Sequence, residues 1–139
     1  MLFGTYEHNL DAKGRVFIPV KIKEHISDTF IMAKSMDPCI SIYSMEMWEQ
    51  YVEKLSALPA VKARGIQRFI FASAVEASVD SQGRVLIPQP LREYAGLEKE
   101  VFILGNNNHA EIWSAKNYAE YTEKQDVDEM ISTLMEMGL

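Results

Sequence analysis

Cysteine is almost absent from this sequence of 139 residues, in which Cys39 stands alone. A single cysteine excludes an intrachain disulfide framework and a zinc site built from thiolates alone. No apolar run approaches the ~20 residues that a membrane-spanning helix needs. The first residues, Met1 to Gly4, also lack the charged and apolar regions of a secretory signal peptide. We therefore expect a protein of the reducing cytoplasm, with no membrane partner.

The motifs of common active sites are missing as well. There is no Gly-rich phosphate loop and no nucleophile motif of the GxSxG type. The histidines, His8, His25 and His109, show no metal-ligand spacing and have no carboxylate or thiol cluster beside them. We therefore expect no enzyme, no metal, no cofactor and no small-molecule substrate. Cys39 is expected to be a buried thiol rather than a nucleophile.

Acidic residues outnumber basic ones, and the formal net charge is −6. Over the whole chain this balance argues against binding to nucleic acid. The excess is local, however, because residues 98–139 hold nine acids and three bases, which leaves residues 1–97 neutral in sum. The segments 11–24 and 60–68 are net basic. A basic surface can therefore exist on this acidic chain.

The chain contains an internal repeat. Residues 6–26 align with residues 75–95 without a gap, and eight of the 21 positions are identical. Both copies contain Asp-x-x-Gly-Arg, at residues 11–15 and 80–84, with Ile-Pro beginning three residues after the Arg. The similarity continues into the later part of each half. A repeat of this length predicts two halves of similar structure.

Each copy predicts the same local structure. Asp and Gly in Asp-x-x-Gly-Arg favour a tight turn, and the β-forming residues around it predict a hairpin with a Gly bulge. A short helix follows each Ile-Pro, and two further strands come next. The strands are expected at residues 16–18, 30–34, 39–43, 85–87, 101–104 and 110–113, and the short helices at residues 21–26 and 90–95.

Three further helices are predicted, two of them from apolar stripes at helical spacing. Trp48, Tyr51, Val52 and Leu55 share one face of a helix that closes the first copy. Pro59 opens a helix that joins the halves and carries Lys62, Arg64 and Arg68, a cluster typical of a solvated helix face. We expect the stripes to lie mostly in the core. The tail stripe is equally compatible with a subunit interface; it consists of Val127, Met130, Ile131, Leu134 and Met135.

A half of about 50 residues buries too little apolar surface to be stable alone. We therefore expect an α+β fold in which both halves build one β-barrel about a pseudo-twofold axis, with helices at the periphery. The expected units are a first half-barrel with its closing helix at residues 1–58, a connecting helix at 59–74, a second half-barrel at 75–125 and a C-terminal helix at 126–139.

The repeated turns are the candidate functional site, and the barrel would bring them to one face. Arg15 and Arg84 offer planar donor forks suited to phosphate or to the guanine edge. Gly14 and Gly83 allow the backbone to approach a ligand closely. Two such hairpins could enter the major groove of double-stranded DNA. The other candidate contacts, several of them to phosphate, are Asp11, Lys13, Lys21, Lys23, Gln82 and Arg92.

Other interpretations of these turns remain open. Asp-x-x-Gly-Arg is also an ordinary surface turn with a solvated Arg, although turn geometry does not explain why the Arg is repeated. Asp11 and Asp80 could instead share a proton, as the catalytic pair of an aspartic protease does. The neighbouring Arg argues against that pair, because it favours both carboxylates in the ionised form.

These residues resemble the MraZ family over nearly all of residues 1–125. In the first copy the resemblance rests on Gly4, Tyr6, His8 and Leu10-Asp11-x-Lys13-Gly14-Arg15, followed by Ile18-Pro19. In the second copy it rests on Asp80-x-Gln82-Gly83-Arg84-x-x-Ile87-Pro88, followed by Leu91 to Leu97. Lys23 departs from the pattern, since the family often has Arg there, and a Lys holds phosphate as a point charge without the fork.

The resemblance implies a swapped-hairpin barrel of the AbrB-like kind, built within one chain. It implies a bacterial transcriptional regulator of the nucleoid that binds short direct repeats upstream of its own gene, in the division and cell-wall gene cluster. It also implies ring-like homo-oligomers, with residues 11–15 and 80–84 contacting DNA. The alternative is an antitoxin-like barrel that captures a partner protein and binds DNA only non-specifically.

Overall fold

The computed structural model describes residues 1–139 and contains eight strands and six helices. The expected strands and helices are all present, with ends that differ from the prediction by at most three residues. The strands are β1 (Thr5–Asn9), β2 (Arg15–Phe17), β3 (Thr29–Lys34), β4 (Ile40–Ser44), β5 (Val75–Ser78), β6 (Arg84–Leu86), β7 (Glu100–Asn106) and β8 (His109–Ser114). The helices are α1 (Val20–Ile26), α2 (Met45–Ser56), α3 (Ala60–Ser73), α4 (Gln89–Ala95), α5 (Ala115–Glu123) and α6 (Val127–Glu136).

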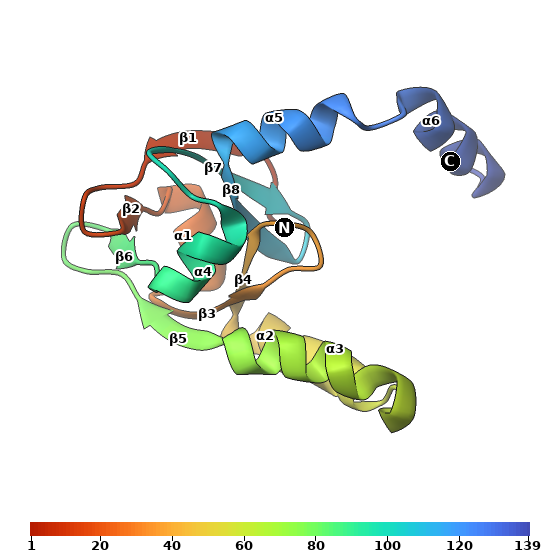
Figure 1. The fold of residues 1–139 in the computed structure, drawn as a ribbon, viewed down its shortest axis with the longest axis horizontal. Helices are drawn as coiled ribbons and strands as arrows, with labels where there is room; N and C mark the ends of the chain where they lie inside the picture. Colours follow the sequence, from red (N-terminus) through yellow and green to blue (C-terminus); the bar gives the residue numbers. More distant parts are fainter.

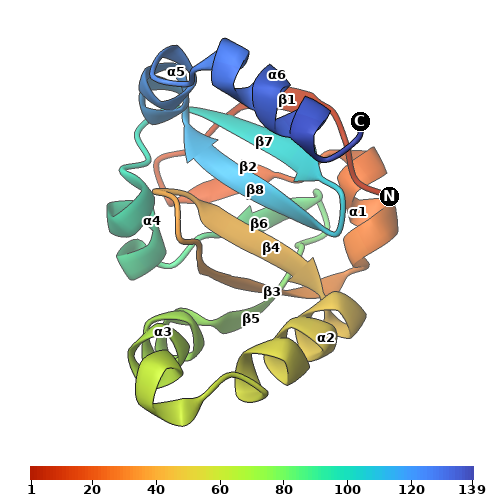
Figure 2. The same ribbon diagram turned by 90° about the vertical axis from the view of Figure 1, so that its right-hand side faces the viewer.

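The strands form a large antiparallel sheet and a small one. The large sheet has the order β1-β7-β8-β4-β3-β5, and the small sheet consists of β2 and β6 (Figure 1). The halves of the chain are interleaved, because β1 of the first half pairs with β7 of the second and β5 of the second pairs with β3 of the first. Figure 2 looks onto the large sheet between α5 and α2, with the small sheet behind it.

The structure corrects two expectations about the turns and the barrel. The strands on either side of each turn do not pair with each other, since β1 pairs with β7 and β2 with β6. The large sheet keeps two free edges, β1 and β5, so a closed barrel is not confirmed. Pro19 and Pro88 have no N–H for a strand ladder, and β2 and β6 end just before them after three residues each. β2 and β6 pair only with each other, so they do not join the two edges of the large sheet.

The main core lies between the two sheets. Ile42 and Ile112, at the centre of the large sheet, are fully buried, and Val16 and Val85 reach them from the small sheet. Helices α1 and α4 close the sides of this core with apolar residues, among them the fully buried Leu91. The alternation of buried Ile with residues of the opposite face along β4 and β8 is what the period of a strand requires. One shared core therefore explains why neither half needs to fold alone.

The opposite face of the large sheet is covered by aromatic residues. Tyr43 stacks on Tyr51 of α2 with ring centroids 5.2 Å apart, and Trp113 lies 5.0 Å from Tyr121 of α5. Helix α3 packs on α2 and β3 through a second, smaller apolar cluster centred on Ile70. The stripe expected on the first closing helix therefore does lie in a core.

The stripe on α6 does not lie in the core. Its central residues, Met130, Ile131 and Leu134, are between 44% and 49% exposed. Figure 1 shows α6 on an arm beyond α5, away from both sheets. None of the helices has the length and apolar composition that a membrane span requires.

We predict that Ile42→Ala lowers the free energy of unfolding by about 2–5 kcal/mol, because it leaves a cavity between the two sheets. Val20→Ala, at a position 62% exposed, should change it by less than about 0.5 kcal/mol. Urea unfolding followed by circular dichroism at one protein concentration measures both. Equal effects of the two substitutions would contradict this location of the core.

Candidate nucleic-acid interface

Each Asp-x-x-Gly-Arg segment folds into the same hydrogen-bonded turn. In the first turn, Asp11 Oδ1 accepts hydrogen bonds from the backbone N–H groups of Lys13 (3.0 Å) and Arg15 (2.9 Å). The second turn repeats the pattern at Asp80, with both distances 2.9 Å. An aspartate whose side chain accepts from the backbone two residues later is typical of tight turns. The repeated Asp is therefore explained by local structure.

The arginine of each turn is held by the aspartate of the same turn. Arg15 Nε donates to Asp11 Oδ2 at 2.8 Å, and Arg84 Nε donates to Asp80 Oδ2 at 3.0 Å. Arg84 Nη1 also lies 4.0 Å from Asp11 Oδ2, so an ion pair connects the two turns. The Arg15 and Arg84 side chains are 28% and 29% exposed. Each guanidinium is thus oriented through Nε, and the Nη groups of Arg15 form no hydrogen bond within the chain.

Backbone hydrogen bonds hold the two turns side by side. Ile18 N–H donates to Gly83 O (3.0 Å), and Ile87 N–H donates to Gly14 O (2.9 Å). The pattern is reciprocal, as a pseudo-twofold axis between the halves requires. Figure 1 shows the β1–β2 and β5–β6 loops together at the end of the molecule opposite to α6. The two repeated segments therefore form one continuous surface, which we call the turn surface.

The small sheet adds two apolar residues to the turn surface. In the β2–β6 register Arg15 lies opposite Leu86, and Phe17 lies opposite Arg84. The central residues of both strands are buried, whereas Phe17 is 38% and Leu86 is 57% exposed. From the sequence, Phe17 and Leu86 are predicted only to lie in the strands at residues 16–18 and 85–87. The alternation of side chains along a strand could have shown their exposure, because the neighbours of an inward-facing Val must face outward.

The two turns are not equivalent. Gly14 (φ +83°) and Gly83 (φ +78°) both adopt the left-handed conformation that favours glycine. A Cβ on Gly14 would lie 2.8 Å from the guanidinium carbon of Arg92, whereas a Cβ on Gly83 would lie 2.9 Å from the Phe17 ring. The first turn therefore packs against a cation and the second against an aromatic ring. The repeat alone does not reveal this difference.

Only some of the remaining candidate residues lie at the turns. Lys13 and Gln82 are exposed in the turns, and the guanidinium of Arg92 lies against the first turn with its Nε buried and unpartnered. Lys23 instead forms an ion pair with Asp28 at 3.1 Å. Lys21 is exposed on α1 and forms no ion pair.

The pKa values of the turn aspartates are lowered. For Asp11 the main cause is the hydrogen bond from the Arg15 backbone N–H, and for Asp80 it is the equivalent bond from Arg84. Both aspartates are therefore ionised in the native protein at neutral pH. A pair of carboxyls that shares a proton needs one raised pKa. Because both pKa values are lowered, the structure argues against the interpretation of Asp11 and Asp80 as an aspartic-protease pair.

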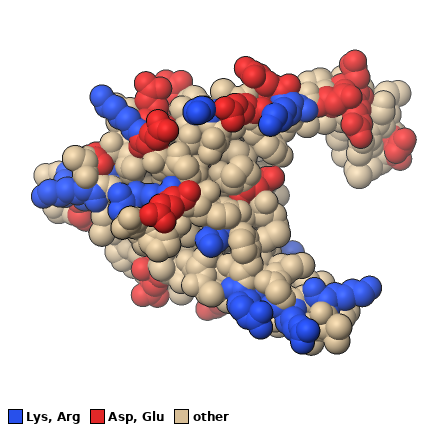
Figure 3. Space-filling view, viewed as in Figure 1, with Lys and Arg blue, Asp and Glu red and all other residues tan.

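The basic residues of α3 do not extend the turn surface. Lys62, Arg64 and Arg68 are exposed, as expected for a solvated helix face. Figure 3 shows Lys and Arg side chains on the arm that contains α3, and also at the tip that carries the turns. The chain therefore has two separate basic regions.

A buried polar cluster lies on the opposite face of the large sheet. Glu111 is 8% exposed and accepts from Trp113 Nε1 (3.0 Å), and His109 Nε2 lies 3.0 Å from its other oxygen. Burial raises the pKa of Glu111, but hydrogen bonds from His109, Trp113 and Asn106 outweigh this effect and lower it. Cys39 is fully buried, and burial raises its pKa to about 12, so its thiol is not a nucleophile.

The sequence matches a known family over both halves. The family model described as "MraZ protein, putative antitoxin-like" matches residues 1–69 and 70–133. This chain belongs to the MraZ family. The transcriptional regulator MraZ of Thermoanaerobacter pseudethanolicus is 44% identical over the full length of both chains. The MraZ of Caldicellulosiruptor bescii is 46% identical over the same share, and that of Caldanaerobacter subterraneus subsp. tengcongensis is 46% identical over 91% of this chain and 90% of its own. The MraZ resemblance inferred from the turns is therefore confirmed.

We predict that the lowered pKa values of Asp11 and Asp80 make the turns sensitive to acid. Each carboxylate stabilises the native state above its ordinary pKa of 3.8, and this contribution is lost as the pH falls through the lower native value. The double variant Asp11→Asn/Asp80→Asn should be less stable than the parent at about pH 7, and the difference should shrink toward about pH 3. Urea unfolding at both pH values measures it.

Glu120→Gln on α5 is the control, because this exposed carboxylate accepts no hydrogen bond and forms no ion pair. It should leave stability unchanged at both pH values. A difference between parent and double variant that is constant with pH would show that the turn carboxylates are not linked to folding in this way.

Proposed function

We propose that this protein is a sequence-specific DNA-binding transcriptional regulator whose turn surface reads double-stranded DNA. The observation that carries the proposal is the reciprocal Ile18–Gly83 and Ile87–Gly14 pairing, which puts two oriented arginines on one rigid ribbon. A two-stranded ribbon has the width to enter the major groove. The curated relatives named above are transcriptional regulators, which agrees with this role.

The chemistry of the turn surface suits base reading. Arg15 and Arg84 present guanidinium forks that can donate two hydrogen bonds to O6 and N7 of guanine. Phe17 and Leu86 offer exposed apolar contact beside them, which suits the methyl group of thymine. The aspartates are already engaged by backbone N–H groups and arginines. Their charge is thereby partly neutralised before any phosphate approaches.

The other cations are suited to phosphate. Lys13 in the first turn and Arg92 behind it have no carboxylate partner, and Lys21 is exposed on α1. Lysine holds phosphate as a point charge, so these contacts position the protein without specifying sequence. Lys23 is the weakest candidate, because Asp28 already neutralises its charge.

The inequivalent turns favour a site without twofold symmetry. Lys13 stands where the second copy has Gln82, and Arg92 and Phe17 contact different turns. One chain would then read an asymmetric element, so that several chains in one orientation would read direct repeats. We place these repeats upstream of the protein's own gene in the division and cell-wall cluster, with the protein in the cytoplasm and at the nucleoid. A ring-like homo-oligomer would add avidity of ~10²–10⁴ over one element.

The second candidate function is an antitoxin-like protein-interaction module with non-specific DNA binding only. The exposed apolar face of α6 favours it, because such a face can capture a partner protein. The two functions differ in salt dependence and in selectivity. A sequence reader prefers the repeated site and loses affinity steeply as salt rises, whereas the interaction module binds every DNA weakly.

We predict that Arg15→Ala/Arg84→Ala abolishes the preference for the upstream repeats over a scrambled fragment. The loss should be at least about tenfold, since a bidentate contact to a base is worth about 1–3 kcal/mol of discrimination. Fluorescence anisotropy at two salt concentrations measures it, with circular dichroism as the test of folding. Unchanged selectivity in a folded double variant would refute the assignment of these residues.

Two controls separate charge from geometry. Arg15→Lys/Arg84→Lys keeps both charges and removes the forks, so affinity for scrambled DNA should persist while the preference is lost. Lys116→Ala removes an exposed cation of α5, remote from the turns, and should change neither quantity.

A further inference from the structure

Helix α6 is amphipathic, and its apolar face has no partner in its own chain. Val127, Met130, Ile131 and Leu134 share one face and are 44–62% exposed. The Asp126 side chain caps the helix by accepting from Glu129 N–H at 3.0 Å. A helix of this length is nevertheless marginal in water without tertiary packing. Its apolar face is therefore expected to be covered in the working protein.

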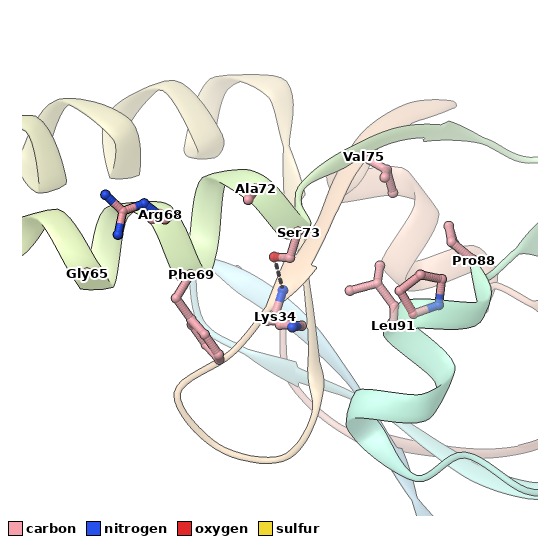
Figure 4. A pocket seen from close by; sticks show the side chains of 10 residues that line it. Lys34, Gly65, Arg68, Phe69, Ala72, Ser73, Val75, Pro88 and Leu91 are labelled. Carbon is pink, nitrogen blue, oxygen red and sulfur yellow. Dashed lines mark hydrogen bonds between the residues drawn. The ribbon is translucent and has the colours of Figure 1, made fainter.

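An apolar groove lies between α3 and the start of α4. It has a volume of about 470 Å³ and is lined mainly by apolar atoms, as Figure 4 shows. Phe69 stands on the α3 side, and Pro88 and Leu91 stand on the α4 side. Lys34 lies between them, with its Nζ over the rings of Phe69 (5.2 Å) and Tyr94 (5.1 Å). An apolar surface with a cation at its centre suits an amphipathic, acidic occupant.

The charges around the two surfaces are complementary. The groove and the exposed side of α3 carry four cations, none in an ion pair within the chain: Lys34, Lys62, Arg64 and Arg68. Helix α6 and its cap carry four acids that are equally unpaired: Asp126, Asp128, Glu129 and Glu136. Figure 3 shows basic side chains on the α2–α3 arm and acidic side chains on the α5–α6 arm. Helix α3 is therefore basic, and helix α6 is acidic.

We propose that α6 of a second copy of this chain docks in the groove between α3 and α4. The chain's own α6 is not the occupant, since Figure 1 places it on a separate arm from α3. Each copy offers one helix and one groove, so the contact is head-to-tail and can close into a ring. The inference rests on the self-association in the proposed function and assigns the surfaces that produce it.

Gly65 supports a close approach of a second helix to the groove. It lies inside α3, lines the groove, and a Cβ built on it meets no atom within 4 Å. Glycine within a helix costs about 1 kcal/mol relative to alanine. Nothing inside the chain requires this glycine, whereas a docked helix would occupy the open space beside it. A side chain introduced there blocks the groove without disturbing the fold.

Two blocking variants test the proposal by light scattering after size exclusion. Gly65→Glu obstructs the groove and repels an acidic helix, but the variant chain keeps an intact α6. Ile131→Lys places a charge on the apolar face of α6, but that variant chain keeps an intact groove. We expect the parent protein to form an oligomer and each variant alone to have the mass of one chain. An equimolar mixture should have the mass of two chains, because one intact helix then meets one intact groove.

Matched controls exclude unrelated effects of the introduced charge. Ser132→Lys places the same residue on the polar face of α6 and should keep the parent mass. Gly65→Ala adds a single methyl and should be at least as stable as the parent to urea. Circular dichroism of Gly65→Glu and Ile131→Lys must match the parent, so that loss of assembly is not loss of folding.

The outcomes separate this proposal from the proposed function. A monomeric parent would overturn both the self-association and this interface. An oligomeric parent whose mass survives both variants, or a mixture that stays monomeric, would overturn the interface alone. Binding of the monomeric variants to a fragment with one repeat tests DNA recognition independently. The variants should bind one repeat with the same affinity as the parent. Their affinity should not rise on fragments with several repeats, whereas that of the parent should.

Discussion

The two turns depend on each other through backbone hydrogen bonds that cross between the halves of the chain. Ile18 donates to the second turn and Ile87 to the first, directly after the β2–β6 pairing. Because these donors and acceptors lie next to buried Val and Ile side chains, leaving them unpaired would cost the desolvation of each group. The position of each turn therefore depends on the other half of the chain. The same bonds set the separation and orientation of the two arginines.

This mutual dependence links stability to recognition. The aspartates that shape the turns also hold Arg15 and Arg84 through Nε, so one set of carboxylates serves both folding and ligand presentation. An arginine that is oriented before binding loses less conformational entropy on binding than a free one. The similarity between the turns does not extend to the side chains packed against them, since Arg92 packs against one turn and Phe17 against the other. A duplicated motif can in this way present two different surfaces.

The distribution of charge has a structural meaning that the total of −6 conceals. The acids of the C-terminal third lie largely on the α5–α6 arm, remote from the turn surface, where they do not oppose a polyanion. The basic residues of α3 lie on the other arm rather than beside the turns. A basic α3 and an acidic α6, each with exposed apolar residues, suit contacts between copies of the chain.

The sequence by itself determined the repeat, the turns and nearly every strand and helix. These features depend on local chemistry: Asp and Gly define the turn, Ile-Pro ends the strand, and apolar spacing defines the helix. It also predicted Arg15 and Arg84 as DNA contacts, because the turn requires Asp and Gly but gives no reason for a repeated Arg.

Only the tertiary structure decided which strands pair. The turn composition suggested that each turn joins two paired strands, yet β1 and β2 pair with strands of the other half. Pairing partners are chosen by the burial of a shared core, which a local pattern does not encode. For the same reason the sequence did not show that Phe17 and Leu86 face outward, that Lys23 is engaged by Asp28, or that the α6 stripe lies outside the core. Each depends on what lies across from the residue in space.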